Sequence, residues 1–207
     1  SFGARELAYV LAQSRAAAIY HADAVRGVSL APIITAATER LPGVCAIRLA
    51  DHDALFGGEE IGQLRETQPT DPIQIQYTSG TTGFPKGALL HQQGLIQNGY
   101  DLCARWGLQP GDRILHFMPL FHTAGCAVLV LGGYSHGAAI LLSPAFEPAM
   151  LARVIAREKV DAFFGVPTMI VGLIDAAQGE KIDVSCVRPI ISGAAIVAPE
   201  LVRQGRD

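Results

Sequence analysis

The chain has little charge, few cysteines and no long uninterrupted apolar run. Only 17% of its 207 residues are Asp, Glu, Lys or Arg, and the formal net charge is −3. Because no broad basic field exists, the composition favours neither nucleic acid nor an anionic membrane surface as a partner. The four cysteines lie far apart without a CxxC pair, which argues against a zinc site or a disulfide framework and for reduced thiols.

Signals that direct a chain to or across a membrane are also missing. The first residues lack the charged-then-apolar order of a signal peptide. The most apolar stretch, 124–142, is interrupted by Gly132, Gly133, Ser135 and His136 and falls short of a continuous span. A buried helix, a turn and a strand explain it better. We therefore expect a soluble, cytoplasmic protein without an integral membrane segment.

Hydrophobic residues, in contrast, occupy half of all positions and alternate between strand-like and helix-like patterns. Repeated strand–helix–strand units predict an α/β fold of mostly parallel sheets flanked by helices. The expected strands are 17–20, 44–49, 73–77, 113–118, 138–142, 162–164 and 187–191. The expected helices are 5–13, 32–40, 92–105, 123–131, 148–158, 167–176 and 199–204.

Two polar segments rich in Gly and Pro interrupt these units. Residues 56–72 have the composition of a surface connection, and residues 107–113 form a sharper break. The second break predicts a first α/β lobe over residues 1–108 and a second lobe over residues 109–207. Nothing in the sequence indicates an oligomeric state.

A loop with many glycines and hydroxyls follows the expected strand 73–77. It reads YTSGTTGFPKG over residues 77–87, and a helical pattern begins after His91. Glycine lets backbone amides approach an anion closely, hydroxyls add donors, and Lys86 adds a positive charge. An apolar ligand would leave these groups unpaired, at about 1–3 kcal/mol each if buried. In α/β sheets ligands bind at the carboxyl ends of strands, so the loop predicts a phosphate site.

The loop is not a Walker P-loop, which has glycine before its lysine and Ser or Thr after it to hold Mg²⁺. Here Pro85 precedes Lys86 and Gly87 follows it. A metal must therefore be held from elsewhere. The alternative interpretation is a solvated Gly/Thr turn with a surface lysine.

The loop resembles the signature loop of the adenylate-forming superfamily, which contains acyl- and aryl-CoA synthetases, peptide-synthetase adenylation domains and luciferases. Three later segments resemble the next blocks of that family in the same order: MPLFHTAG at 118–125, FFGVPTM at 163–169 and ISGAAIVAPE at 191–200. The resemblance implies part of the two-lobed N-terminal domain of an AMP-binding acyl-CoA synthetase.

Such enzymes join a carboxylate to the α-phosphate of ATP, release pyrophosphate and pass the acyl group to a thiol, commonly that of coenzyme A. Because the attack joins two anions, catalysis depends on alignment and charge neutralisation. The resemblance implies ATP, Mg²⁺ and coenzyme A as cofactors and a carboxylic acid as substrate. The combination of FHTAG and FFGVPTM is most similar to synthetases that act on medium-chain or related fatty acids. It assigns the grip on the β- and γ-phosphates to Thr78, Ser79, Gly80, Thr81, Thr82, Gly83 and Lys86.

The three later segments carry the remaining candidate residues. The resemblance places His122 beside the carboxylate and the α-phosphate, where a ring N–H can donate to an oxygen; a core histidine bonded to backbone is the alternative. FFGVPTM would line the acyl channel, although Phe163 is expected in the core. Among the other histidines, His91 is expected to cap a helix or to lie on the surface, and His116 is expected to be structural. Adenine and the acyl carbonyl are placed near a segment that could also be a plain tight turn, namely Gly193, Ala194 and Ala195.

The resemblance ends after the third later block. The acidic Mg²⁺ ligand, the ribose-binding aspartate and the mobile C-terminal domain with its lysine are not found, so no metal ligand is assigned in this chain. We therefore expect a fragment. A peptide-synthetase adenylation domain is one alternative, although its matching block usually lacks the histidine of PLFHTAG. A non-catalytic nucleotide-binding protein of the same fold is another, and a kinase-like phosphotransferase is disfavoured by the missing Walker Ser/Thr.

The isolated 207-residue chain is expected not to turn over, because its phosphate loop lacks the metal ligand and the adenylating lysine. Incubation with ATP, Mg²⁺ and a panel of carboxylic acids should yield no acyl-adenylate by mass spectrometry. Carboxylate-dependent adenylate formation by this chain alone would contradict the expectation.

Overall fold

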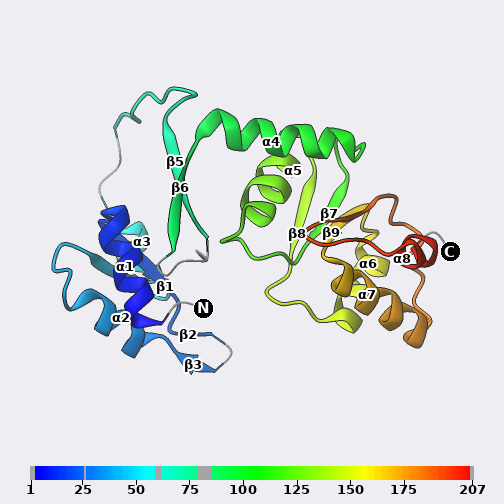
Figure 1. The fold of residues 1–207 in the computed structure, drawn as a ribbon, viewed down its shortest axis with the longest axis horizontal. Helices are drawn as coiled ribbons and strands as arrows, with labels where there is room; N and C mark the ends of the chain where they lie inside the picture. Colours follow the sequence, from blue (N-terminus) through cyan, green and yellow to red (C-terminus); the bar gives the residue numbers. More distant parts are fainter. Residues whose placement is uncertain (1–2, 26, 59–61, 79–84, 206–207) are drawn as a thin grey trace. The chain divides into compact units, whose positions relative to one another are not determined.

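The computed structural model describes residues 3–25, 27–58, 62–78 and 85–205 (Figure 1). Helices alternate with short, mostly parallel strands, so the predicted α/β class is confirmed. The chain forms two compact units, which are described separately. The first contains Ser1–Gln68 and Tyr77–Leu89, and the second contains Pro69–Gln76 and Leu90–Asp207.

The first unit is built on a short parallel pair, β1 (Ala18–His21) with β4 (Cys45–Arg48). The helices α1 (Ala4–Ser14) and α2 (Ala31–Thr38) contact each other beside it. Each of these four elements was predicted to within two residues at either end. The helices bury the apolar side chains Leu11, Ile34 and Ala37.

Three small elements of this unit were not predicted. The antiparallel pair β2 (Ala24–Val25) and β3 (Val28–Ser29) has two residues in each strand, too few to show an alternating pattern. The helix α3 (His52–Phe56) is five residues long, and Asp51 caps it by accepting the Ala54 amide at 3.1 Å. Elements this short leave only turn and cap residues as a signal.

The strand before the phosphate loop belongs to a hairpin. β5 (Pro72–Thr78) pairs with β6 (Lys86–His91) in a two-stranded sheet. A connection of seven residues allows only an antiparallel pair, since parallel strands need a longer crossover. The sequence pattern predicted a direct strand-to-helix connection here and was wrong, because KGALLH was taken as the end of the loop.

The second unit contains a four-stranded parallel sheet in the order β10-β9-β7-β8. Its strands are three or four residues long and lie within or close to the predicted ranges. They are β7 (Arg113–His116), β8 (Ala139–Leu142), β9 (Ala162–Gly165) and β10 (Ile190–Ser192).

Helices cover both faces of this sheet (Figure 1). Neighbouring residues of a strand point to opposite faces. Ile114 lies in a cluster with residues of α4 (Gln92–Arg105) and η1 (Ala124–Gly132). Leu115 lies in a cluster with residues of α6 (Pro148–Glu158) and α7 (Pro167–Glu180). The second cluster also includes Leu201 of α8 (Pro199–Gln204).

The most apolar stretch folds as η1, the short helix α5 (Gly133–Ser135) and β8, which confirms the predicted order of helix, turn and strand. Across the described part of the chain, every helix is too short or too polar to span a bilayer.

The helix η1 is a π-helix, whereas an α-helix was predicted over 123–131, and it contacts α4 backbone to backbone. A Cβ atom on Gly99 would lie 2.5 Å from the Ala127 carbonyl oxygen, and one on Gly132 would lie 2.5 Å from the Gly99 carbonyl oxygen. Cys103 is fully buried at this contact, and burial raises the pKa of its thiol to about 11. No methyl group fits between the two helices.

Replacing Gly99 with alanine should therefore destabilise the protein, although alanine is the better helix former. Overpacking at this contact should lower the free energy of unfolding by about 1–3 kcal/mol, measured by urea denaturation.

Gly179 of α7 provides the matched control, because nothing lies within 4 Å of a Cβ added there. Gly179→Ala should raise stability by about 0.5–1 kcal/mol. Equal and small effects of the two substitutions would show that α4 and η1 are not packed this closely.

Candidate functional site

The four-stranded sheet has a topological switch point between β7 and β9. From β7 the chain passes through η1 on one face and enters β8, whereas from β9 it passes through α7 on the other face and enters β10. In open α/β sheets ligands bind at the carboxyl ends of strands where the connections diverge in this way. The segments that follow β7, β9 and β10 are the three later segments singled out in the sequence.

The segment after β7 forms a tight turn that carries His122. The His122 amide donates to the Pro119 carbonyl at 3.1 Å, and its carbonyl accepts from the amides of Gly125 and Cys126 at 2.9 and 3.1 Å. The turn folds back so closely that a Cβ atom on Gly125 would lie 2.3 Å from the Pro119 carbonyl oxygen. Residues 119–125, here called the His122 turn, therefore require glycine at their end.

The ring of His122 is exposed, and the backbone of the turn orients it. The Ala124 amide donates to Nδ1 at 3.1 Å. A ring nitrogen that accepts a hydrogen bond carries no proton, so the proton of the neutral ring lies on Nε2. Nε2–H is then the donor that the ring can offer to a ligand oxygen. His122 is thus not the buried core histidine of the alternative interpretation.

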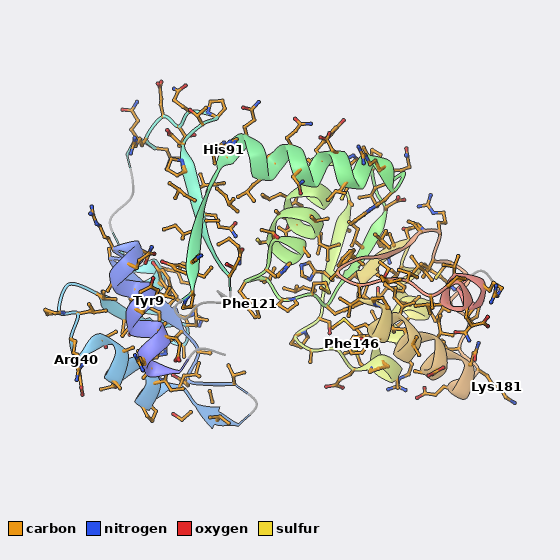
Figure 2. All side chains as sticks on the ribbon, viewed as in Figure 1. Tyr9, Arg40, His91, Phe121, Phe146 and Lys181 are labelled. Carbon is orange, nitrogen blue, oxygen red and sulfur yellow. The ribbon has the colours of Figure 1, made fainter. Side chains whose placement is uncertain are left out.

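His116 is the buried histidine of this region, with none of its surface exposed. Its Nε2 donates to the Gly125 carbonyl at 3.1 Å, and its Nδ1 has no partner among the described residues. This bond ties β7 to the end of the His122 turn, in agreement with the structural role predicted for it. His91 caps α4 as predicted, since its Nδ1 accepts the Gly94 amide at 3.1 Å (Figure 2).

Two glutamines of β5 hold the His122 turn from outside. Gln76 Nε2 donates to the Phe121 carbonyl at 2.8 Å, and Gln74 Nε2 donates to Gln76 Oε1 at 2.8 Å. Gln74 Nε2 also lies 3.5 Å from Cys126 Sγ. We call Gln74 and Gln76 the glutamine pair. Neither glutamine was predicted as a functional residue; the signal in the sequence is the alternation IQIQ at 73–76, which places both side chains on one face of a strand.

The residues Gly193, Ala194 and Ala195 follow β10 directly. A Cβ atom on Gly193 would lie 3.2 Å from two ring atoms of Phe164, so the absence of a side chain lets this segment contact that ring. Ala194 has a left-handed φ of 68°, which costs a residue with a Cβ atom about 1–2 kcal/mol. Ala194 and Ala195 are both exposed. Backbone strain of this kind clusters at functional sites.

The segment after β9 lies between the segments after β7 and β10, because β9 lies between these two strands in the sheet. Phe163 belongs to the core, as predicted, and is 3% exposed. Val166 and Pro167 begin α7 at the carboxyl end of β9. Only the short stretch around these two residues lies at the edge of the sheet where a ligand is expected.

The phosphate loop is described only at its two ends. Thr78 and Lys86 are exposed and belong to the first unit, and the Thr78 hydroxyl donates to the Lys86 carbonyl at 3.5 Å. The other five predicted phosphate-binding residues lie outside the described residues. They are Ser79, Gly80, Thr81, Thr82 and Gly83.

Among the described residues no three His, Cys, Asp or Glu side chains come together in a group that could hold a metal ion. The described residues therefore offer no preformed site of three protein ligands.

The strain at Ala194 predicts that glycine stabilises the protein there. Ala194→Gly should raise the free energy of unfolding by about 0.4–1 kcal/mol, because glycine adopts the left-handed conformation without a Cβ penalty. Ala195→Gly, next to it but outside that conformation, should leave stability unchanged or lower it. Thermal unfolding of the two variants measures the difference, and no difference would refute the strain.

The sequence matches the model of the family "AMP-binding enzyme" over residues 1–207. It is 33% identical over 79% of its length to the mitochondrial medium-chain acyl-CoA ligase ACSF2 of Rattus norvegicus, of which the match covers 28%. It is 34% identical over 71% of its length to an indoleacetate–CoA ligase of Aromatoleum aromaticum, of which the match covers 29%. The matched part of the chain thus covers less than a third of the length of each of these relatives.

A solved structure shares the fold. The inhibitor-bound crystal structure of the N-terminal domain of FACL13 from Mycobacterium tuberculosis superposes with a TM-score of 0.84 at 22% identity. The superposition covers 99% of this chain and 51% of that one. At this level of identity the likeness concerns the fold alone.

Proposed function

The chain belongs to the family of AMP-binding enzymes, and from that premise we propose that it is part of an acyl-CoA synthetase. The complete protein activates a carboxylic acid with ATP, forms an acyl-adenylate and pyrophosphate, and transfers the acyl group to coenzyme A. The observation that carries the proposal is the exposed His122 at the switch point of the sheet, whose Nε2–H has no partner among the described residues.

The first step joins two negatively charged groups. A carboxylate oxygen attacks the α-phosphorus of ATP, and the bond to the bridging oxygen breaks with its electron pair leaving on pyrophosphate. His122 donates its Nε2–H to an oxygen of the carboxylate or the α-phosphate as the two approach. Because Ala124 already occupies Nδ1, the ring acts as a fixed donor and not as a base.

The other proposed residues bind the nucleotide. Lys86 and Thr78 stand at the two ends of the phosphate loop, and Lys86 supplies the exposed positive charge that β- and γ-phosphates attract. Adenine and the acyl carbonyl are assigned to the segment after β10, where the backbone is exposed beside small side chains. Mg²⁺, when bound with ATP, neutralises part of the phosphate charge, and its ligands are proposed to lie outside this chain. The other loop residues proposed to bind the β- and γ-phosphates are Ser79, Gly80, Thr81, Thr82 and Gly83.

The proposed acid is a fatty acid of medium length. The combination of FHTAG and FFGVPTM supports it, as does the likeness to the medium-chain ligase. Because the chain is similarly close to an indoleacetate–CoA ligase, aromatic acids are the substrates to compare with medium-chain fatty acids. The cytoplasmic location, the lobes at 1–108 and 109–207, and the inactivity of the isolated chain stay predictions.

Replacing His122 with alanine in the complete protein tests the proposal. Loss of one donor to the reacting oxygens should lower the kcat of carboxylate-dependent ATP–pyrophosphate exchange by about 100-fold or more, with little change in the KM for ATP.

His91→Ala is the matched control, because His91 is also exposed and its Nδ1 also accepts a backbone amide. Losing that cap should lower stability by about 1 kcal/mol and leave the exchange rate unchanged. Equal rates for the His122 and His91 variants would remove His122 from the mechanism.

A further inference from the structure

The glutamine pair connects the His122 turn to the strand that enters the phosphate loop. Gln76 lies two residues before Thr78, the first residue assigned to phosphate binding. Its side-chain amide donates to the carbonyl of Phe121 at 2.8 Å. Phe121 directly precedes His122 in the sequence. Gln74, Gln76 and the whole His122 turn belong to the same compact unit.

The contacts of the pair lie on both sides of His122 in the sequence. Gln76 holds Phe121, and Gln74 contacts Cys126, whose amide donates to the His122 carbonyl. The direction of the bonds is fixed as well. Gln76 Oε1 accepts from Gln74, which turns Gln76 Nε2 toward the Phe121 carbonyl.

Apolar packing does little to hold the turn in place. The Phe121 side chain is 81% exposed and that of Leu120 is 49% exposed. Gln74 and Gln76 are half-buried. The turn is therefore held by hydrogen bonds, from His116 to the Gly125 carbonyl at one end and from Gln76 to the Phe121 carbonyl before His122.

We propose that Gln76, supported by Gln74, is a positioning residue that fixes the His122 turn against the strand carrying the phosphate loop. The inference rests on the proposed function. The proposed step requires the His122 ring to be held at a fixed position beside the reacting oxygens. A displacement of about 1 Å between reacting groups can cost about 100-fold in rate. The bond from Gln76 to the Phe121 carbonyl holds the backbone next to that ring.

The first variant to test is Gln76→Met in the complete protein. Methionine has a similar length but no N–H donor, so the bond to Phe121 is lost without a large change in volume. The kcat of carboxylate-dependent pyrophosphate exchange at about pH 7.5 should fall about 10–100-fold, while the KM for ATP changes less than about threefold.

Gln76→Glu separates positioning from a general loss of structure. The ionised carboxylate still accepts from Gln74 but has no proton for the Phe121 carbonyl, whereas the protonated form restores that donor. The ordinary pKa of glutamate is about 4.3, and a facing carbonyl oxygen disfavours its ionised form. The rate of this variant relative to wild type should therefore rise as the pH falls from about 7.5 to about 5.5. Wild type is measured at each pH, so pH effects common to both proteins cancel in that ratio.

Gln97→Glu is the matched control. Gln97 Nε2 donates to Asp101 Oδ1 at 2.8 Å on the exposed side of α4, so the same substitution breaks a bond of the same kind away from the turn. Its rate relative to wild type should stay near one at every pH.

A wild-type kcat in Gln76→Met, or a pH-independent ratio for Gln76→Glu, overturns the inference. If wild type itself shows no carboxylate-dependent exchange, the proposed function fails and hydrogen exchange decides on the positioning role. Gln76→Met should then accelerate amide exchange in the peptide 119–126 several-fold, and Gln97→Glu should not. Unchanged exchange in that peptide overturns the inference independently of activity.

Discussion

The hydrogen bond from the Ala124 amide to Nδ1 of His122 is the contact on which the proposed chemistry depends. It makes the neutral ring a donor at Nε2 and prevents it from acting there as a base. The bond exists because Gly125 lets the chain fold back on Pro119. His116 and Gln76 then hold the turn at two points, one from inside the sheet and one from β5. The chemistry therefore rests on backbone geometry as much as on the histidine itself.

The proposed site and an ion network that stabilises the fold lie at opposite edges of the four-stranded sheet. The His122 turn and the segment after β10 lie at the carboxyl edge, on strands placed by the close contact of α4 with η1 and by the core under α6 and α7. At the amino edge Arg188 bonds Asp112 at 2.5 Å and Asp161 at 2.9 Å, and these bonds raise the pKa of its guanidinium. This ion network ties the start of β7 to the segments that lead into β9 and β10, away from the proposed substrates.

Much of the architecture could be predicted from local sequence. The helices 92–105, 148–158 and 199–204 have the predicted bounds, because proline near the first turn or an apolar stripe marks them clearly. The hairpin of β5 and β6 and the π-helix were not predicted, since pairing and a wide helical turn depend on tertiary contacts. The family and the candidate residues came from motifs. The contact of Gln76 with Phe121 could not be foreseen, because it joins residues 45 positions apart, and the strained φ of Ala194 leaves no mark in the sequence.

The most direct test follows an oxygen atom. The complete protein is supplied with ATP, coenzyme A and a medium-chain fatty acid labelled with ¹⁸O in its carboxylate. The masses of the products are then measured by mass spectrometry. If a carboxylate oxygen attacks the α-phosphorus, that oxygen stays with the nucleotide when the thiol takes the acyl group. The account therefore predicts ¹⁸O-labelled AMP and unlabelled pyrophosphate. Label in inorganic phosphate together with ADP, or acyl-CoA formed without labelled AMP, would contradict it.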